Sequence, residues 1–89
     1  MTFFWDKFMI EAVLLDVKGL LCPLPVLKAN RALNRLKEGT CLRVLATDRN
    51  AIGDFQEFCR QTGHALIAFS EEGETLSFLI RHKQKSISK

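Results

Sequence analysis

The sequence predicts an α/β fold, a two-layer sandwich of βαβαββ order with two helices packed on one face of a four-stranded mixed sheet. Three observations predict it. Two segments carry apolar residues at helical spacing, strand-like segments alternate with them, and the last two strands are joined by the turn Glu71-Glu72-Gly73-Glu74. Since every element has one apolar face, stacking the helices on the sheet buries all of these faces together.

The first half of the chain predicts a strand and a long amphipathic helix. The strand is expected at 13–17 and turns at Gly19, and the helix is expected over 23–37, with Gly39 as the glycine after its end. On a helical wheel one face is apolar and the opposite face is basic. The apolar residues are Val26, Ala29, Ala32, Leu33 and Leu36. The basic residues are Lys28, Arg31 and Arg35.

The second half predicts a strand over 40–47, a helix over 51–62 ended by Gly63, and strands over 65–69 and 75–80. Asp48 and Asn50 offer capping side chains for the helix, and Asp54 is interpreted as another helix-start residue, whose charge suits that end of the dipole. The apolar face of the helix comprises Ala51, Ile52, Phe55, Phe58 and Cys59. In the last strand, one face is richer in apolar residues and comprises Leu76, Phe78 and Ile80. The opposite face carries Ser77 and Arg81.

Length and composition indicate a single soluble domain at 12–82, preceded by an aromatic extension at 1–11 and followed by a basic tail at 83–89. Of the 89 residues, 47% are hydrophobic and 26% charged, as in ordinary globular proteins. The net charge of +3 is too small to predict nucleic-acid binding. No apolar run approaches the roughly 20 residues that span a bilayer, so no membrane association is expected.

The aromatic extension allows three interpretations. It can cover a second sheet face, it can form a dimer contact, or Met9 can be the true start of the protein. The second face would expose Leu45, Leu66, Ala68 and Leu79. The expected oligomeric state is a monomer or a weak dimer.

The most informative motif is Cys22-Pro23-Leu24-Pro25, at the junction between the first strand and the first helix. Proline suits the first helical position, so Cys22 is predicted to be the N-cap, with its sulfur at the positive end of the helix dipole. Because Pro25 has no N–H, the Leu24 N–H is the expected donor to the sulfur. With Lys18 and Lys28 as nearby cations, we expect the thiol to be about half ionised at neutral pH.

The surroundings of the motif predict a docking surface. The two prolines stiffen the presentation of the sulfur, and Leu24 lies on the exposed side of the helix. Four basic residues are candidates for contacts with a partner protein: Lys18, Lys28, Arg31 and Arg35. No catalytic base, metal-ligand spacing or resolving cysteine accompanies Cys22, which favours a group carrier over a redox or metal site.

The remaining cysteines and histidines suggest no chemistry. Cys59 lies on an apolar helix face and is expected in the core, while Cys41 opens a strand. His64 and His82 lack partners at ligand spacing and are expected to be structural or solvent-exposed. Because the three cysteines form neither a disulfide framework nor a zinc motif, the cytoplasm is the expected compartment and no cofactor or metal is expected.

The segment 15–26, Leu-Asp-Val-Lys-Gly-Leu-Leu-Cys-Pro-Leu-Pro-Val, resembles the signature of the TusA (SirA-like) sulfurtransferase family. The resemblance covers about residues 12 to 82 and continues through Gly39, the strand ending Ala46-Thr47-Asp48, Asp54, Phe58-Cys59 and Gly63-His64. It implies the same βαβαββ sandwich. It also implies that Cys22 carries sulfur as a persulfide, taken from a cysteine desulfurase and passed to downstream sulfur-relay proteins, in the best-known case for thiolation of the tRNA wobble uridine.

Two features depart from the family pattern. The position between the prolines is often acidic or polar in the family and is Leu24 here, which bears on the identity of the docking partner. The aromatic start at 3–8 is also outside the common pattern. Related members serve other sulfur or selenium pathways.

A different class of function remains open, a non-catalytic regulatory or interaction module. Its basic helix face and tail would bind RNA or an acidic protein. The basic residues are not interleaved with exposed aromatic side chains, as they usually are in single-strand binders, so direct nucleic-acid binding is not expected.

Overall fold

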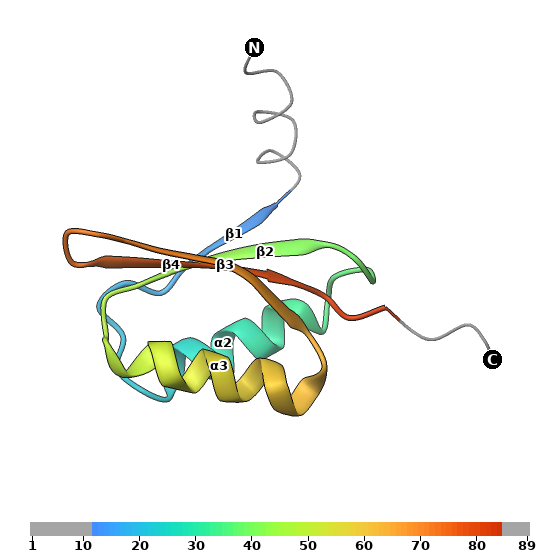
Figure 1. Cartoon of the computed structure of the whole chain (residues 1–89), viewed down its shortest axis with the longest axis horizontal. Helices are drawn as coiled ribbons and strands as arrows, with labels where there is room; N and C mark the ends of the chain where they lie inside the picture. The colour runs from blue at the N-terminus through green and yellow to red at the C-terminus, as the bar shows by residue number, and fades with distance from the viewer. Residues whose placement is uncertain (1–11, 85–89) are drawn as a thin grey trace, which may run out of the picture.

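The computed structural model describes residues 12–84 and shows the predicted α/β sandwich. In chain order the elements are β1 (Val13–Asp16), α2 (Leu24–Leu33), β2 (Cys41–Ala46), α3 (Asn50–Thr62), β3 (Ala65–Glu72) and β4 (Thr75–Arg81). Figure 1 shows both helices on the same side of the sheet. The βαβαββ order and the two-layer arrangement are therefore confirmed.

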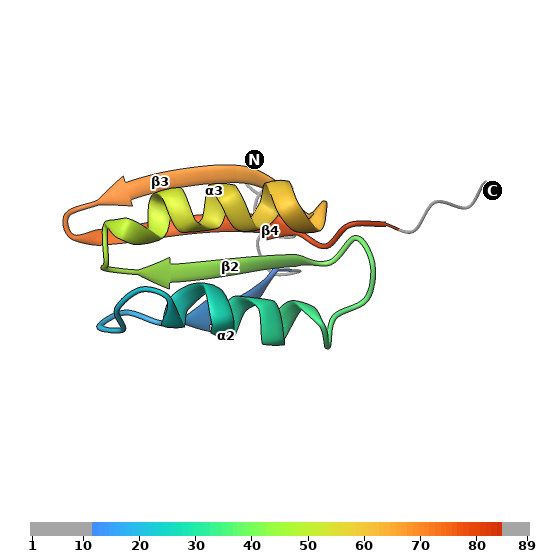
Figure 2. The ribbon, with the colours of Figure 1, turned by 90° about the horizontal axis from the view of Figure 1, so that it is seen from below.

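The four strands form one mixed sheet in the order β1-β2-β4-β3. β1 and β2 run parallel, because α2 carries the chain back across the sheet between them, while β4 is antiparallel to both of its neighbours. Seen from below in Figure 2, the helices lie side by side, α2 near β1 and β2 and α3 near β3 and β4. The carboxyl ends of β1 and β2 consequently meet at one edge, beside the amino ends of both helices.

The core lies between the helices and the sheet, where the predicted apolar faces meet. Phe55 of α3 packs on Phe78 of β4 with ring centroids 4.6 Å apart, and neither ring is exposed to solvent. Other fully buried side chains come from α2 and the central strands: Ala29, Leu33, Leu42, Val44, Leu76 and Ile80. Among the described residues, no helix is long and apolar enough to cross a membrane.

Both ends of α2 differ from the prediction. The helix begins at Leu24 rather than Pro23, and it ends at Leu33 rather than at 37. Beyond Leu33 the N–H groups of Arg35 and Leu36 bond carbonyls three residues back, so the chain continues as tight turns. Gly39 is not the residue that ends the helix. Its positive φ of 83° serves the loop into β2, where its N–H donates to the His82 carbonyl at 3.1 Å.

The second face of the sheet differs from the prediction at Leu66. Leu66 pairs with Ile80 and packs against the core, whereas Ala68 pairs with Leu79 on the opposite face. The register shifts between Leu66 and Ala68, and an inserted residue changes which face the neighbouring side chains take. The aromatic extension at 1–11, which was one candidate to cover this face, lies outside the described residues.

Candidate functional site

The loop that carries Cys22 is fixed to the connection between β2 and α3. The Cys22 N–H donates to Asp48 Oδ2 at 2.6 Å, and the Gly19 N–H donates to Thr47 Oγ1 at 2.9 Å. Gly19 has a φ of 85°, a conformation open to glycine at little cost. Asp48 also accepts the Asn50 N–H through Oδ1 at 3.0 Å, but the predicted capping is wrong, because α3 begins at Asn50, Arg49 is its N-cap and no side chain caps it. Asp48 therefore binds backbone N–H groups at the starts of both helices, one of them that of Cys22 itself.

Cys22 is not the N-cap of α2, contrary to the prediction. Pro23 occupies that position, no side chain caps the helix, and the Leu24 N–H donates to the Leu21 carbonyl at 2.9 Å instead of to the sulfur. Asp48 binds the Cys22 N–H, and Cys22 and Pro23 lie in a turn before the helix. The helix therefore begins one residue later than predicted. The peptide bond between them is cis. Pro25 is the second helical residue and is buried.

The sulfur of Cys22 faces the carboxylate of Asp54, from the second turn of α3. Cys22 Sγ donates a hydrogen bond to Asp54 Oδ2. Cys22 is exposed, so the sulfur is accessible from solvent. The sequence reasoning missed this contact, because it interpreted Asp54 only as a helix-start residue.

The electrostatics of the site reverse the expected ionisation of Cys22. The hydrogen bond to Asp54 is the main cause that raises the pKa of the thiol, followed by desolvation and by the negative charges of Asp54 and Asp48. Lys18, expected as an activating cation, lies 3.8 Å from a carboxylate oxygen of Asp16. The prediction of a half-ionised thiol was therefore wrong, since the neighbours of the sulfur are carboxylates.

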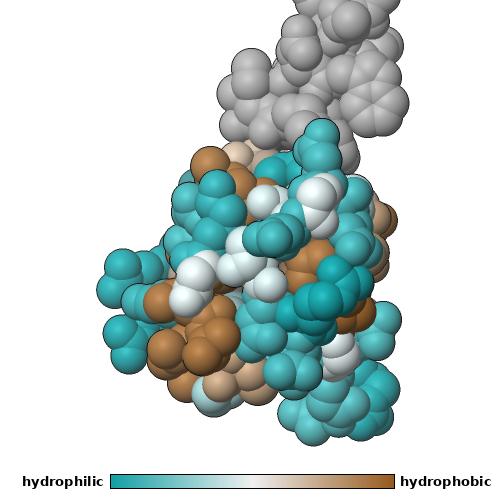
Figure 3. All heavy atoms as spheres, turned by 90° about the vertical axis from the view of Figure 1, so that its left-hand side faces the viewer, coloured by the Kyte–Doolittle hydropathy of each residue, from teal (hydrophilic) through white to brown (hydrophobic). Residues whose placement is uncertain are grey.

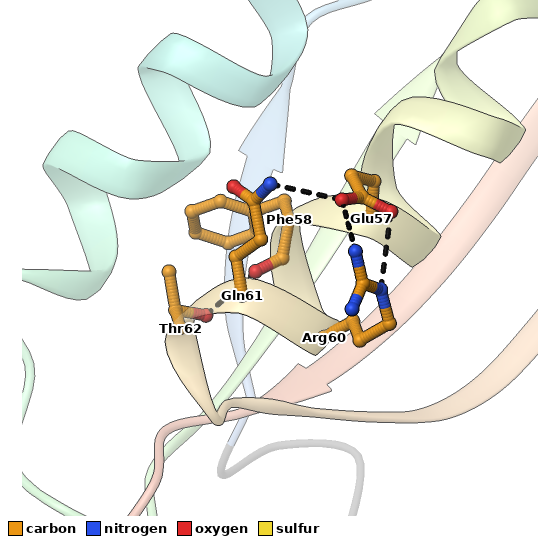
Figure 4. Close-up of polar contacts among 5 residues, drawn as sticks. All are labelled: Glu57, Phe58, Arg60, Gln61 and Thr62. Carbon is orange, nitrogen blue, oxygen red and sulfur yellow. Dashed lines mark hydrogen bonds and ion pairs between the residues drawn. The ribbon is translucent and has the colours of Figure 1, made fainter.

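A shallow groove of about 240 Å³ begins at the sulfur and runs between α2 and α3. We call it the thiol groove; it is lined by Cys22, Pro23, Val26, Asp54, Glu57, Phe58 and Gln61. Glu57 on its α3 wall accepts hydrogen bonds from Arg60 and Gln61, drawn as dashed lines in Figure 4. The bond from Gln61 is 2.8 Å long. Of the two carboxylates in the groove, only Asp54 bonds the thiol, whereas Glu57 already has a cationic partner.

The predicted basic residues gather on the other flank of α2. Lys28, Arg31 and Arg35, here called the basic cluster, line a separate hollow of about 180 Å³ with Leu15 and Ala32. No residue is shared between this hollow and the thiol groove. The structure thus brings the three side chains together, but it does not bring them to the sulfur.

Exposed leucines surround the motif. Leu21 is 70% exposed, Leu24 44% and Leu27 54%, and we call these three residues the leucine patch. The exposure of Leu24 was predicted, whereas those of Leu21 and Leu27 were not. Figure 3 shows the end of the molecule that bears the loop before α2, where brown surface gathers at the lower left between teal areas. Large apolar side chains left in solvent beside a reactive group are typical of a docking surface.

The other cysteines and His64 have structural surroundings. Cys59 is buried, as predicted, and burial raises its pKa to about 11. Cys41 is half-buried at the start of β2, roughly 20 Å from the Asp48 end by the length of the strand. His64 is buried and accepts the Lys83 N–H through Nδ1 at 3.0 Å. Within residues 12–84 no cluster of three or more His, Cys, Asp or Glu side chains could bind a metal ion.

The family model described as "Sulfurtransferase TusA" matches residues 13–82. The chain belongs to the TusA family. A putative sulfur carrier protein of Neisseria meningitidis serogroup A is 52% identical to it over 69 residues, which cover 78% of this chain and 93% of that one. The sulfur carrier protein TusA of Allochromatium vinosum is 46% identical over 67 residues, covering 75% and 88% of the two chains.

The crystal structure of a SirA-like protein from Desulfitobacterium hafniense has the same fold as this TusA-family chain. The TM-score is 0.72 at 22% sequence identity, and the match covers 81% of this chain and 99% of that one. The resemblance inferred from the Cys22–Pro25 segment is thereby confirmed at the level of the family and of the fold.

Proposed function

We propose that this chain is a sulfur carrier that holds sulfur as a persulfide on Cys22. It receives the sulfur from a cysteine desulfurase and delivers it to an acceptor protein. The observation that carries this proposal is the position of the sulfur, which is exposed at the head of the thiol groove while Cys41 is half-buried and Cys59 is buried. Its relatives named as sulfur carriers support the same role.

Sulfur uptake requires only an exchange between thiol and persulfide. Cys22 Sγ attacks the terminal sulfur of a persulfide R–S–SH on the donor, a bond forms between Sγ and that sulfur, and the S–S bond of the donor breaks. The proton of Cys22 passes to the departing R–S⁻, which leaves as R–SH. No electrons are gained or lost overall, so the carrier needs neither a cofactor nor a second cysteine.

Delivery repeats this exchange with an acceptor cysteine, and we propose that tRNA 2-thiouridine formation is one destination of the sulfur. The chain then acts as a sulfurtransferase through protein partners, without binding nucleic acid itself. Its three cysteines are all free thiols, which suits the reducing cytoplasm.

The docking surface proposed for these partners combines apolar and charged residues. The leucine patch adjoins the sulfur and would be covered by the partner, with Leu24 next to Pro23 in the motif itself. Lys18 and the basic cluster are proposed to contribute at the rim, where charges accelerate and orient encounter. A monomer, or at most a weak dimer, leaves this surface available.

The test is sulfur loading followed by mass spectrometry of the intact protein. After incubation with a cysteine desulfurase and cysteine, the wild type is expected to gain the mass of a sulfur atom, and Cys22→Ala is expected to gain none. Cys41→Ala is the matched control and should load like the wild type. Equal loading of Cys22→Ala, or no loading of the wild type, would exclude a carrier function through Cys22.

A further inference from the structure

Within residues 12–84, the charged groups that act on Cys22 are carboxylates. Asp54 Oδ2 accepts a hydrogen bond from its thiol, and Asp48 Oδ2 accepts one from its backbone N–H at 2.6 Å. Both negative charges act on the thiol, and among the residues that the structure describes no cation does. The nearest lysine in sequence, Lys18, is 3.8 Å from Asp16, and the basic cluster lines the opposite flank of α2. This arrangement is the reverse of the cationic surroundings that activate a nucleophilic cysteine.

Such surroundings have a chemical consequence. The thiolate is the nucleophile, and a thiol that donates a hydrogen bond to a carboxylate keeps its proton and stays in the neutral form. An exposed but protonated sulfur reacts slowly with disulfides and oxidants that it meets in solution. A carrier nevertheless has to form the thiolate once its proper donor has docked, so the interaction with Asp54 has to be broken at that moment.

We propose that Asp54 keeps the sulfur-free Cys22 protonated, and that a partner releases the thiolate by bringing a cationic group to the Asp54 carboxylate. This inference rests on the proposed carrier function and adds the chemistry of the partner. A guanidinium, ammonium or imidazolium group that enters the thiol groove forms an ion pair with Asp54 and competes for its oxygen atoms. Without the carboxylate as acceptor, the exposed thiol loses its proton to solvent water and becomes the thiolate. The docking segment of the partner is then a basic residue flanked by apolar ones, which cover the leucine patch.

Glu57 provides a matched control for Asp54. It lines the same groove on the same helix, but its oxygen atoms are bonded to Arg60 and Gln61 rather than to the sulfur. Glu57→Gln therefore removes one negative charge from the groove without removing the acceptor of the Cys22 proton. Asp54→Asn removes both the charge and the carboxylate acceptor while preserving the size of the side chain.

The first measurement is the pH profile of Cys22 alkylation by iodoacetamide, a neutral reagent, resolved from Cys41 and Cys59 by peptide mapping. In Asp54→Asn the midpoint should move to lower pH, and a move of one unit makes alkylation near neutral pH about tenfold faster. Glu57→Gln should keep the wild-type profile, and Asp54→Glu should stay closer to the wild type than Asp54→Asn does. Circular dichroism confirms that each variant is folded. An unchanged midpoint in folded Asp54→Asn would overturn the proposal.

The second measurement tests release by a cation, with cystamine as a dicationic disulfide and bis(2-hydroxyethyl) disulfide as a neutral one. In both cases Cys22 Sγ bonds to one sulfur, the S–S bond breaks, and the departing thiolate takes up the proton. The ratio of the two rate constants is compared with that of an unstructured peptide containing residues 19–25. We expect the wild type to favour cystamine several-fold more than the peptide does, and Asp54→Asn to lose this preference. A ratio equal to that of the peptide, or one unchanged in Asp54→Asn, contradicts release by a cation.

Neither measurement uses a sulfur donor. If the wild type fails to load sulfur while both reactivity results hold, the carrier function is wrong and the interaction between Asp54 and the thiol stands. If loading succeeds and the reactivity results fail, the carrier function stands and the role assigned to Asp54 is wrong.

Discussion

Cys22 and Cys59 show how the surroundings of a single residue decide the chemistry of a thiol. Cys22 is exposed, and its hydrogen bond to Asp54 is the main cause that raises the pKa of its thiol. Cys59 is buried, and desolvation raises the pKa of its thiol to about 11. The first cause can be removed by a partner, because it depends on one accessible carboxylate. The second persists for as long as the protein is folded. Of these two cysteines, Cys22 is the one whose surroundings fit the proposed change between an unreactive and a reactive state.

Cys59 leads to a prediction about stability at alkaline pH. In the unfolded chain its thiol ionises above its ordinary pKa of about 8.5, while in the folded protein it stays protonated up to about pH 11. Between about pH 8.5 and about pH 11 the unfolded state binds fewer protons than the folded state. Ionisation of Cys59 in the unfolded chain therefore lowers the free energy of unfolding as the pH rises. Urea unfolding across this range should show a steeper loss for the wild type than for Cys59→Ala. Equal slopes would show that the thiol is not protected in the native state.

The sequence predicts some of these residues and not others. Cys22 is recognisable because its prolines are neighbours in the chain and carry a known signature. Asp54 is 32 positions away, and its contact with the sulfur depends jointly on the turn at Cys22 and on the orientation of α3. An aspartate in the first turns of a helix looks the same in sequence whether or not it meets a thiol. The raised pKa of Cys22 could not be predicted for the same reason.

At the scale of elements, His64 connects the end of α3 to the end of β4. Its ring packs on Phe58 with centroids 5.7 Å apart and on His82 at 4.7 Å, and its Nδ1 accepts the Lys83 N–H. Burial is the main cause that lowers the pKa of His64, with the charges of His82 and Lys83 adding to it. The neutral ring is thus the form that holds these two segments together.

A prediction at acidic pH follows from this connection. The unfolded chain protonates His64 near its ordinary pKa of about 6.5, and the native state resists protonation, so the stabilisation is present above this pH and is lost as the pH falls below it. In urea unfolding, the free energy of unfolding should fall more between about pH 7.5 and about pH 5 for the wild type than for His64→Gln. The glutamine keeps an acceptor for the Lys83 N–H but does not titrate. If both proteins lose the same free energy, His64 makes no contribution to the pH dependence.

The elements themselves were predictable from periodicity, and their ends were less so. The start of α2 differs from the prediction because Asp48 binds the Cys22 N–H. Asp48 is far from Cys22 in the sequence, so this contact could not be predicted. The predicted sheet face of Leu66 was wrong because β3 has a register shift between Leu66 and Ala68 where it pairs with β4. The alternation of apolar residues in the sequence does not reveal such a shift. Both errors arise from contacts between elements rather than within them.

At the scale of the whole molecule, one hydrophobic core supports the site. Phe55 lies at its centre, against Phe58 and Phe78, and on the same helix that carries Asp54. Phe55→Ala is expected to lower the free energy of unfolding by about 3–5 kcal/mol, a large share of the total for a domain of this size. Ile52→Ala, at a half-buried position of the same helix, should cost less. Chemical denaturation of both variants provides the comparison, and equal losses would argue against Phe55 as the centre of the core.

The overall architecture was predictable because every helix and strand has one apolar face, and few arrangements bury all of these faces. The arrangement in turn places the site, since the parallel pairing of β1 and β2 brings the loops after both strands to one edge. Cys22 follows the first of these strands, and Asp48 and Asp54 follow the second. The fold therefore assembles the thiol and its two carboxylates from segments that the sequence keeps apart.

The most direct test of a persulfide on Cys22 is to locate the sulfur that a cysteine desulfurase delivers. After loading with cysteine, the persulfide is trapped with iodoacetamide, and the chain is digested and mapped by mass spectrometry. If Cys22 carries the persulfide, the added sulfur lies on the peptide that contains Cys22, with none on the peptides of Cys41 and Cys59. Sulfur on either of the other two cysteines with none on Cys22 would contradict this prediction.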